Sequence, residues 1–289
     1  MNVFSRSWQI TKLSFSVINK DRELLWFALL SFVFSTMFAV AMIVPSVLPD
    51  LMSGEESIQT LEVYQYVLIF LTYFGLAFIA TFFNVCVVYT AKVRFEGGNA
   101  TFDESLKFAF SKLKLIAQWS VLSASVGLLL KVLERLAASL GKGGEIVARI
   151  IIGLMGAAWS ITTIFVVPIL VYDNLGPIEA VKKSLKAVKE TWGENIVKSL
   201  GLGLMTFLAF LLIGVASVGL TILLANQFDI AGLLAGIAIG GCLLLLTGLI
   251  FNVASTIFTT ALYVYASEQV VATDFDEGLL KNAFKFKKK

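Results

Sequence analysis

The residues of this chain whose type and spacing could support binding chemistry are lysines that recur along predicted helices. In the segment that follows Gly176, the basic residues are Lys182, Lys183, Lys186 and Lys189. Its apolar residues recur at intervals of four, three and four and mark one face of a helix: Val181, Leu185, Val188 and Trp192. Such a helix can lie in the headgroup plane of a membrane, with its lysines near anionic lipid. We therefore predict a basic helix at the membrane interface.

A second segment repeats this pattern earlier in the chain. Its basic residues are Lys107, Lys112 and Lys114, and its apolar face is formed by Leu106, Ala109, Phe110, Leu113 and Ala117. Two interpretations fit both segments. In the first, the apolar face enters the acyl boundary of the lipid. In the second, the helices pack on the ends of the membrane spans and only connect them. The basic polar faces favour the first.

Chemistry beyond binding has little support in the sequence. Glu104, Glu179 and Glu277 each fall in the first turn of a predicted helix, where the helix dipole favours a carboxylate. We prefer this helix-start role to acid–base catalysis. The chain contains no histidine, and its two cysteines, Cys86 and Cys242, lie in apolar runs. We therefore expect no enzymatic activity, no catalytic residues, no metal site and no cofactor. We also expect no nucleic-acid partner, because the net charge of +3 is a by-product of the uneven distribution of basic residues about the spans.

The basic amphipathic segments are separated by long apolar runs, which determine where they lie. The chain of 289 residues is 58% hydrophobic and only 15% charged, which is typical of a polytopic membrane protein. A helix of about 20 apolar residues crosses a bilayer and satisfies its own backbone polar groups. Six such runs are predicted, at residues 24–48, 64–91, 116–130, 146–172, 196–225 and 230–266. The prediction is an all-α protein that forms a single six-span domain over residues 1–289.

The basic residues gather on one side of these spans. All but four of the 23 lysines and arginines lie before the first span, in or close to the linkers after the second and fourth spans, or in the tail. The exceptions are Lys131, Arg135, Lys142 and Arg149. Because cytoplasmic segments carry an excess of lysine and arginine, we expect both termini in the cytoplasm.

Several features within the spans are interpreted as packing elements. Gly232, Gly236 and Gly240 are spaced by four, and small residues at this spacing let two helices approach closely. Pro168 removes one backbone hydrogen bond and should kink its span near residues 163–164, which makes it a candidate hinge. Polar side chains in the spans, such as Ser120, are expected to hydrogen-bond between helices, with a polar pathway as the less favoured interpretation.

A weak internal repeat relates three parts of the chain. Residues 81–90, 163–172 and 256–265 each begin with Thr-x-Phe, and each precedes a predicted amphipathic helix. The repeat predicts a module of one amphipathic helix plus two spans that is used three times. The N-terminal segment would supply the first amphipathic helix.

Three stretches carry a resemblance to a known family: QWSVLSASVGLLLKVLER from Gln118, AAWSITTIFVVPILVYDNLGPIEAVKKS from Ala157 and KETWGEN from Lys189. They resemble an uncharacterised prokaryotic family of six-span inner-membrane proteins, a domain of unknown function. They are more distantly similar to the membrane domain fused to some glycerophosphodiester phosphodiesterases. The resemblance implies a multi-pass protein of the prokaryotic cytoplasmic membrane. It implies no phosphodiesterase activity, because the catalytic domain of those proteins has no counterpart in this chain.

Two functions of different classes follow as hypotheses. The first is a non-enzymatic protein that organises the membrane or associates with lipid, with anionic membrane lipids as the partners of its basic helices. The second is a channel or facilitator for a small neutral solute or a lipid, lined by polar side chains of the spans. A homo-oligomer or another membrane protein is a further candidate partner. The abundance of amphipathic helices favours the first hypothesis.

Overall fold

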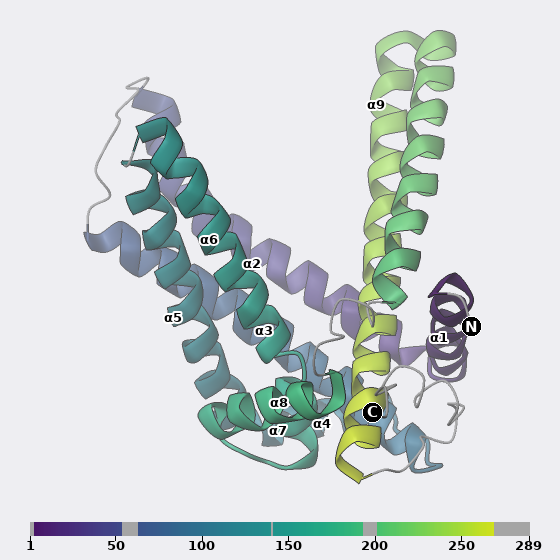
Figure 1. Ribbon diagram of the computed structural model, residues 1–289. Coiled ribbons are helices and arrows are strands. Elements are labelled where there is room, and N and C mark those ends of the chain that lie inside the picture. Colours follow the sequence, from purple (N-terminus) through teal and green to yellow (C-terminus); the bar gives the residue numbers. More distant parts are fainter. Residues whose placement is uncertain (1–2, 54–62, 140, 193–200, 269–289) are drawn as a thin grey trace. The chain divides into compact units, whose positions relative to one another are not determined.

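A computed structural model of the chain describes residues 3–53, 63–139, 141–192 and 201–268. Within these ranges the chain is helical and contains no strand (Figure 1). The helices are α1 (Val3–Lys20), α2 (Glu23–Ser53), α3 (Val63–Phe95), α4 (Phe102–Ser111), α5 (Leu113–Ala138), α6 (Gly141–Thr162), α7 (Val166–Tyr172), α8 (Pro177–Trp192) and α9 (Gly201–Glu268). The prediction of an all-α protein is confirmed for the described residues.

Five segments of the described chain are long and apolar enough to cross a membrane. They are Glu23–Met42, Tyr64–Phe95, Leu113–Ala138, Gly143–Tyr172 and Gly203–Val264. These segments fit a multi-pass membrane protein, because about 20 apolar residues in a helix are enough to span the hydrocarbon core. The predicted third span, at residues 116–130, lies within α5, a helix of 26 residues. The helix is therefore longer than the apolar run from which the span was predicted. Residues 196–200 of the predicted fifth span lie outside the described residues.

The longest segment, α9, folds back on itself. Its backbone leaves helical geometry at Phe228 (φ −130°, ψ 17°) and Asp229 (φ 50°, ψ −130°). On either side of this break, the first arm (residues 201–227) and the second arm (residues 230–268) lie side by side and antiparallel (Figure 1). The segment Gly203–Val264, of 62 residues, therefore consists of two helical arms, each long enough to cross a bilayer.

The described residues divide into two compact units. The first unit takes residues from 1–29, 90–100 and 190–289, and the second takes residues from 30–89 and 101–189. Residues of α2 and α3 belong partly to one unit and partly to the other. A single domain over the whole chain stays a prediction.

In the first unit, α1 packs against α9 (Figure 1). Ser14 and Val17 of α1 are fully buried. The ring of Phe15 meets that of Phe251 on the second arm edge-on, with 5.7 Å between centroids. Edge-to-face pairs at this distance add to the energy gained from burial of the rings. The N-terminal helix is therefore part of the folded unit and not only a leader to the first span.

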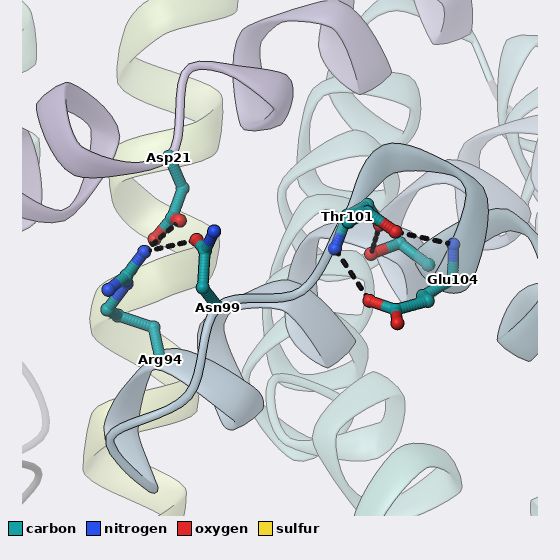
Figure 2. A network of polar contacts seen from close by, with 6 residues as sticks. Asp21, Arg94, Asn99, Thr101 and Glu104 are labelled. Atoms are coloured by element: carbon teal, nitrogen blue, oxygen red, sulfur yellow. Dashed lines mark hydrogen bonds and ion pairs between the residues drawn. The ribbon is translucent and has the colours of Figure 1, made fainter.

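The same unit contains an ion pair between the α1–α2 turn and the end of α3. The carboxylate of Asp21, which is only 1% exposed, accepts a hydrogen bond from Arg94 Nε at 2.6 Å and a second from Arg94 Nη2 (Figure 2). Arg94 Nη2 also donates to Asn99 Oδ1 at 2.6 Å. Helix α3 ends beside this pair, because Gly97 adopts φ 84°, a conformation that side chains disfavour. The bidentate geometry fixes two chain segments that are 73 residues apart.

In the second unit, α5 and α6 lie side by side (Figure 1). The rings of Trp119 on α5 and Trp159 on α6 stack with 6.0 Å between centroids. On the side of α3, Gly127 of α5 faces Tyr73, and a Cβ at that glycine would lie 3.1 Å from the ring. Close approach of α5 to Tyr73 of α3 therefore depends on the small residue at position 127.

The kink predicted for the fourth span is a break between two helices. Helix α6 ends at Thr162 and α7 begins at Val166, and residues 163–165 form a turn between them. Pro168, the third residue of α7, lacks the N–H that would bond the carbonyl four residues earlier. The break includes the predicted position, residues 163–164. A hinge motion at Pro168 stays a prediction.

The three segments that begin with Thr-x-Phe are among the most buried stretches of the chain. Most residues of 81–90 and 256–264 and the run from Phe165 to Val171 are buried, whereas the other parts of the spans are largely exposed. Their backbones differ, because 81–90 and 256–265 are continuous helix and 163–172 contains the break. A module repeated three times therefore stays a prediction.

Candidate membrane-interface site

The first predicted interface helix, α4, begins with a capping box. Thr101 Oγ1 accepts the Glu104 backbone N–H at 3.3 Å, and Glu104 Oε2 accepts the Thr101 N–H at 2.8 Å (Figure 2). The bond from the Thr101 backbone N–H holds the pKa of Glu104 below its usual value. The helix-start role predicted for Glu104 is confirmed. Glu179 likewise lies in the first turn of α8, and Glu277 lies outside the described residues.

Helix α4 is held to α3 by aromatic contacts. Phe110 meets Phe82 edge-on at 5.1 Å, and Phe108 stacks on Tyr89 at 4.3 Å between centroids. Ser105 and Ala109 are buried on the packed face, while Phe110 stays 58% exposed. This helix therefore packs against α3, and the ring of Phe110 contacts α3 while more than half of its surface stays exposed.

The lysines predicted for the first interface helix have three different surroundings. Lys107 is exposed and pairs with Asp103 at 2.5 Å, and this hydrogen bond raises the pKa of Lys107. Lys112 ends α4, lies 5.1 Å above the Phe108 ring, and donates to Asn174 Oδ1 at 2.6 Å. Lys114 is exposed in the first turn of α5. The predicted amphipathic helix that ran on to Ala117 is wrong in extent, because Lys112 leaves helical geometry and a second helix starts there.

Helix α8 has one face buried within the protein. Ala180 and Ser184 are fully buried and Val188 is 2% exposed, so the contact face follows positions spaced by four. Ser184 Oγ accepts a hydrogen bond from the Phe165 backbone N–H at 3.2 Å. That N–H has lost its place in the helical ladder at the α6–α7 break, and the buried serine satisfies it. Helix α8 is therefore fixed to the break by a specific polar contact.

An ion pair also connects α8 to the end of α7. Lys183 Nζ lies 2.6 Å from Asp173 Oδ1, with the two side chains 38% and 25% exposed. Asp173 caps the C-terminus of α7, and Asn174 follows it with φ 55°, in the left-handed region. Asparagine tolerates this conformation better than most residues. Lys183 and Lys112 thus both bond within the protein, each to a residue of the α7–α8 turn.

The remaining lysines of α8 form what we call the basic face, which consists of Lys182, Lys186 and Lys189. All three are exposed on the side of the helix away from Ala180 and Ser184. The residues predicted to enter lipid are divided between two environments: Val181 and Leu185 are half-buried beside the basic face, and Val188 is buried. The side chain of Trp192, the last residue of α8, lies outside the described residues. The apolar face is therefore partly used for contacts inside the protein.

The predicted row of small residues lies at the contact between the two arms of α9. Gly232, Gly236 and Gly240 are all buried. A Cβ at Gly236 would lie 2.6 Å from Thr221 Cα, and one at Gly240 would lie 2.8 Å from Ser217 Cβ. A Cβ at Gly232 would meet backbone atoms of the first arm at less than van der Waals distance. The glycines allow the two arms to approach closely.

Groups for other chemistry are sparse among the described residues. Cys86 and Cys242 are both free thiols. In the part of the chain that the structure describes, no cluster of three or more His, Cys, Asp or Glu side chains could hold a metal ion. The arrangement around α8 therefore offers positive charge and apolar surface.

Sequence reasoning missed two residues that hold α8 in place. Ser184 was overlooked because a serine between lysines is typical of a solvated surface, and Asn174 was treated only as part of a turn. A break in an apolar helix leaves backbone N–H groups without partners in that helix. A hydroxyl-bearing residue on the following helix could therefore have been predicted to accept one of these hydrogen bonds.

Comparisons with known proteins give one match. A family model described as a family of unknown function (DUF6159) matches residues 63–273. The matched part begins at α3 and continues beyond α9. No curated protein and no solved structure matches the chain.

Proposed function

Because the chain belongs to this family of unknown function (DUF6159), we propose a function from the geometry of its interface helices. The protein is a non-enzymatic, multi-pass membrane protein that associates with anionic lipid through the basic face of α8. The observation that carries the proposal is the exposure of Lys182, Lys186 and Lys189 on a helix whose opposite face is fixed by Ser184.

A docked basic helix differs physically from a free amphipathic peptide. Its backbone is already ordered by contacts with α7, so binding to lipid does not have to order it. Each lysine near an anionic membrane surface contributes about 1 kcal/mol, so the three lysines of the basic face contribute about 3 kcal/mol at low salt. The half-buried Val181 and Leu185 lie beside the lysines and add a narrow apolar edge. Attraction to headgroups, more than insertion into the acyl region, is therefore the basis of the interaction.

The proposal includes six spans with both termini in the cytoplasm. Support for six comes from the two arms of α9, each of which is long enough to cross the membrane, in addition to the four other segments. Support for the orientation comes from the lysine excess on one side of the spans. With this topology, α4 and α8 lie on the cytoplasmic side of a prokaryotic inner membrane. We also propose that the chain is distantly related to the membrane domains of glycerophosphodiester phosphodiesterases.

A channel for a small neutral solute is the alternative, and the span hydroxyls support it less. Ser120 Oγ donates to the Ile116 carbonyl at 2.8 Å, and Ser125 Oγ donates to the Val121 carbonyl at 2.8 Å. For these two residues the predicted hydrogen bonds between helices are wrong, because each hydroxyl bonds to its own helix. Hydroxyls used in this way do not need a polar lumen to satisfy them.

A polarity-sensitive fluorophore on α8 tests the proposal in the full-length protein. The probe is attached to a cysteine at Ile178, which is 59% exposed, in a background without the native cysteines. In vesicles that contain phosphatidylglycerol, its emission should shift to the blue and its quenching by iodide should fall, relative to phosphatidylcholine vesicles. Salt should reverse both changes, because the attraction is screened within a Debye length of about 8 Å at physiological ionic strength.

The matched variant replaces all three lysines of the basic face by glutamine. It should remove the response at Ile178 and leave a probe at Ile146, which is 62% exposed on α6, unaffected. An equal response with and without the three lysines would show that α8 is only a connector.

A further inference from the structure

The second unit contains a cavity that the basic face of α8 does not explain. It has a volume of about 670 Å³ and lies between α3, α5 and α6. Three cationic side chains line it, Lys131 and Arg135 from α5 and Arg149 from α6. Among the described residues that line the cavity, Glu134 is the one carboxylate. A volume of this size is typical of small-molecule sites, which fall at about 300–1,000 Å³.

The cavity arises from two facing stripes on neighbouring helices. On α5, Lys131, Glu134 and Arg135 are spaced by three and four and therefore share one face. On α6, Arg149 and Gly153 are spaced by four in the same way. A Cβ at Gly153 would meet nothing within 4 Å, so the absence of a side chain there leaves open space beneath the cations. Tyr66 of α3 adds a phenol to the lining.

Charged side chains are uncommon within membrane-spanning segments, so these three cations call for an explanation. Both helices belong to segments apolar enough to span the membrane, and ionisable residues within such segments mark functional sites. Neighbouring carboxylates neutralise part of the charge, since Lys131 lies 3.3 Å from Glu134 and Arg149 lies 2.6 Å from Glu145.

From this geometry we infer that the cavity between α3, α5 and α6 binds a phosphate group, either in a glycerophospholipid headgroup or as a free phosphate. Arginine and lysine are the side chains that recognise phosphate, and arginine does so with two parallel hydrogen bonds. The lining also fits an amphiphile, because the apolar residues Leu130 and Ile152 line the cavity together with the cations. This site goes beyond the proposed function and does not depend on α8.

The test measures thermal unfolding of the full-length protein in neutral detergent with four additives: phosphatidylglycerol, diacylglycerol, glycerol 3-phosphate and inorganic phosphate. Phosphatidylglycerol should raise the midpoint with increasing concentration, because a ligand that binds only the folded state stabilises it. Diacylglycerol, which lacks phosphate, should have no effect. A similar rise with inorganic phosphate alone would identify a soluble ligand, and a rise only with phosphatidylglycerol would identify the lipid.

Three variants decide whether the response belongs to this cavity, and all are made in a protein whose three basic-face lysines are already glutamine, so that α8 does not contribute. Replacing Arg135 and Arg149 together by glutamine should weaken the apparent affinity at least tenfold. Gly153→Leu should abolish the response by filling the open space while keeping all charges, so it remains informative if the arginine variant folds poorly. Lys12→Gln, an exposed residue of α1, removes one charge elsewhere and should change nothing. A shift with phosphatidylglycerol that survives both cavity variants, or no shift with any phosphate compound, would overturn the inference.

Discussion

Replacing Gly236 by alanine should separate the two arms of α9. A Cβ at this position would lie 2.6 Å from Thr221 Cα and 2.9 Å from Thr221 Cβ, and a backbone atom cannot rotate away from it. Removing a glycine from a helix interior favours the helix by about 0.5–1 kcal/mol, whereas overpacking costs about 1–3 kcal/mol. The overlap is with backbone, so we expect the cost to exceed the gain and the folded protein to lose about 1–2 kcal/mol.

Gly241→Ala on the same arm is the matched control. This glycine is exposed, and a Cβ there would meet nothing within 4 Å. The control gains the same helix propensity without any overlap, so the difference in stability between the two variants isolates the contact with Thr221. Unfolding in mixed micelles by titration with dodecyl sulfate, followed by circular dichroism, measures that difference. Equal stability of the two variants would refute close packing of the arms, and Gly236→Leu should show the same contrast in stronger form.

Three further predictions test other contacts. Ser184→Ala leaves a buried backbone N–H without its acceptor and should cost about 1–3 kcal/mol of unfolding free energy. Asp21→Asn removes the buried charge that pairs with the half-buried Arg94 and should cost about 3 kcal/mol or more, with a lower thermal midpoint as the readout. In a cysteine-free background, a membrane-impermeant thiol reagent added outside the cell should label a cysteine at Gly143 and miss one at Asn174.

Controls for these predictions come from exposed residues of the same kinds. Ser111→Ala and Glu96→Gln, both on the surface, should change the unfolding free energy by less than about 0.5 kcal/mol. A loss at Ser184 no greater than the loss at Ser111 would contradict the role of the hydroxyl at the α6–α7 break. Similar losses at Asp21 and Glu96 would contradict the buried pair, and external labelling at Asn174 would contradict the orientation.

The helical class and the membrane segments could be predicted because apolar runs carry a strong signal. A run long enough to cross the bilayer has few alternatives to a helix, since its backbone polar groups must bond within the segment. The break near Pro168 was predictable for a similar reason, because proline lacks the N–H that the ladder requires. The loss of helical geometry at Lys112 could not be predicted, since lysine is a good helix former and the residues around it continue the apolar pattern.

The orientation of α8 shows why faces are harder to predict than helices. Apolar periodicity pointed to Val181 and Leu185, but the helix buries Ala180 and Ser184, whose small side chains allow close approach. The buried side of α8 is therefore the side that carries Ala180 and Ser184, whose hydropathy gives no strong signal. The pairing of Asp21 with Arg94 was out of reach because it joins positions 73 residues apart. The cavity beside Arg149 could not be predicted either, because it depends on which helices pack against one another.

A density map of the protein in nanodiscs that contain phosphatidylglycerol would test lipid association at α8. The proposal predicts headgroup density within hydrogen-bonding distance of Lys182, Lys186 or Lys189, with α8 docked on α7 through Ser184. It also predicts that this density disappears in phosphatidylcholine nanodiscs. A basic face surrounded only by bulk water in both lipids, together with a continuous polar lumen through the spans, would contradict lipid association and establish the channel in its place.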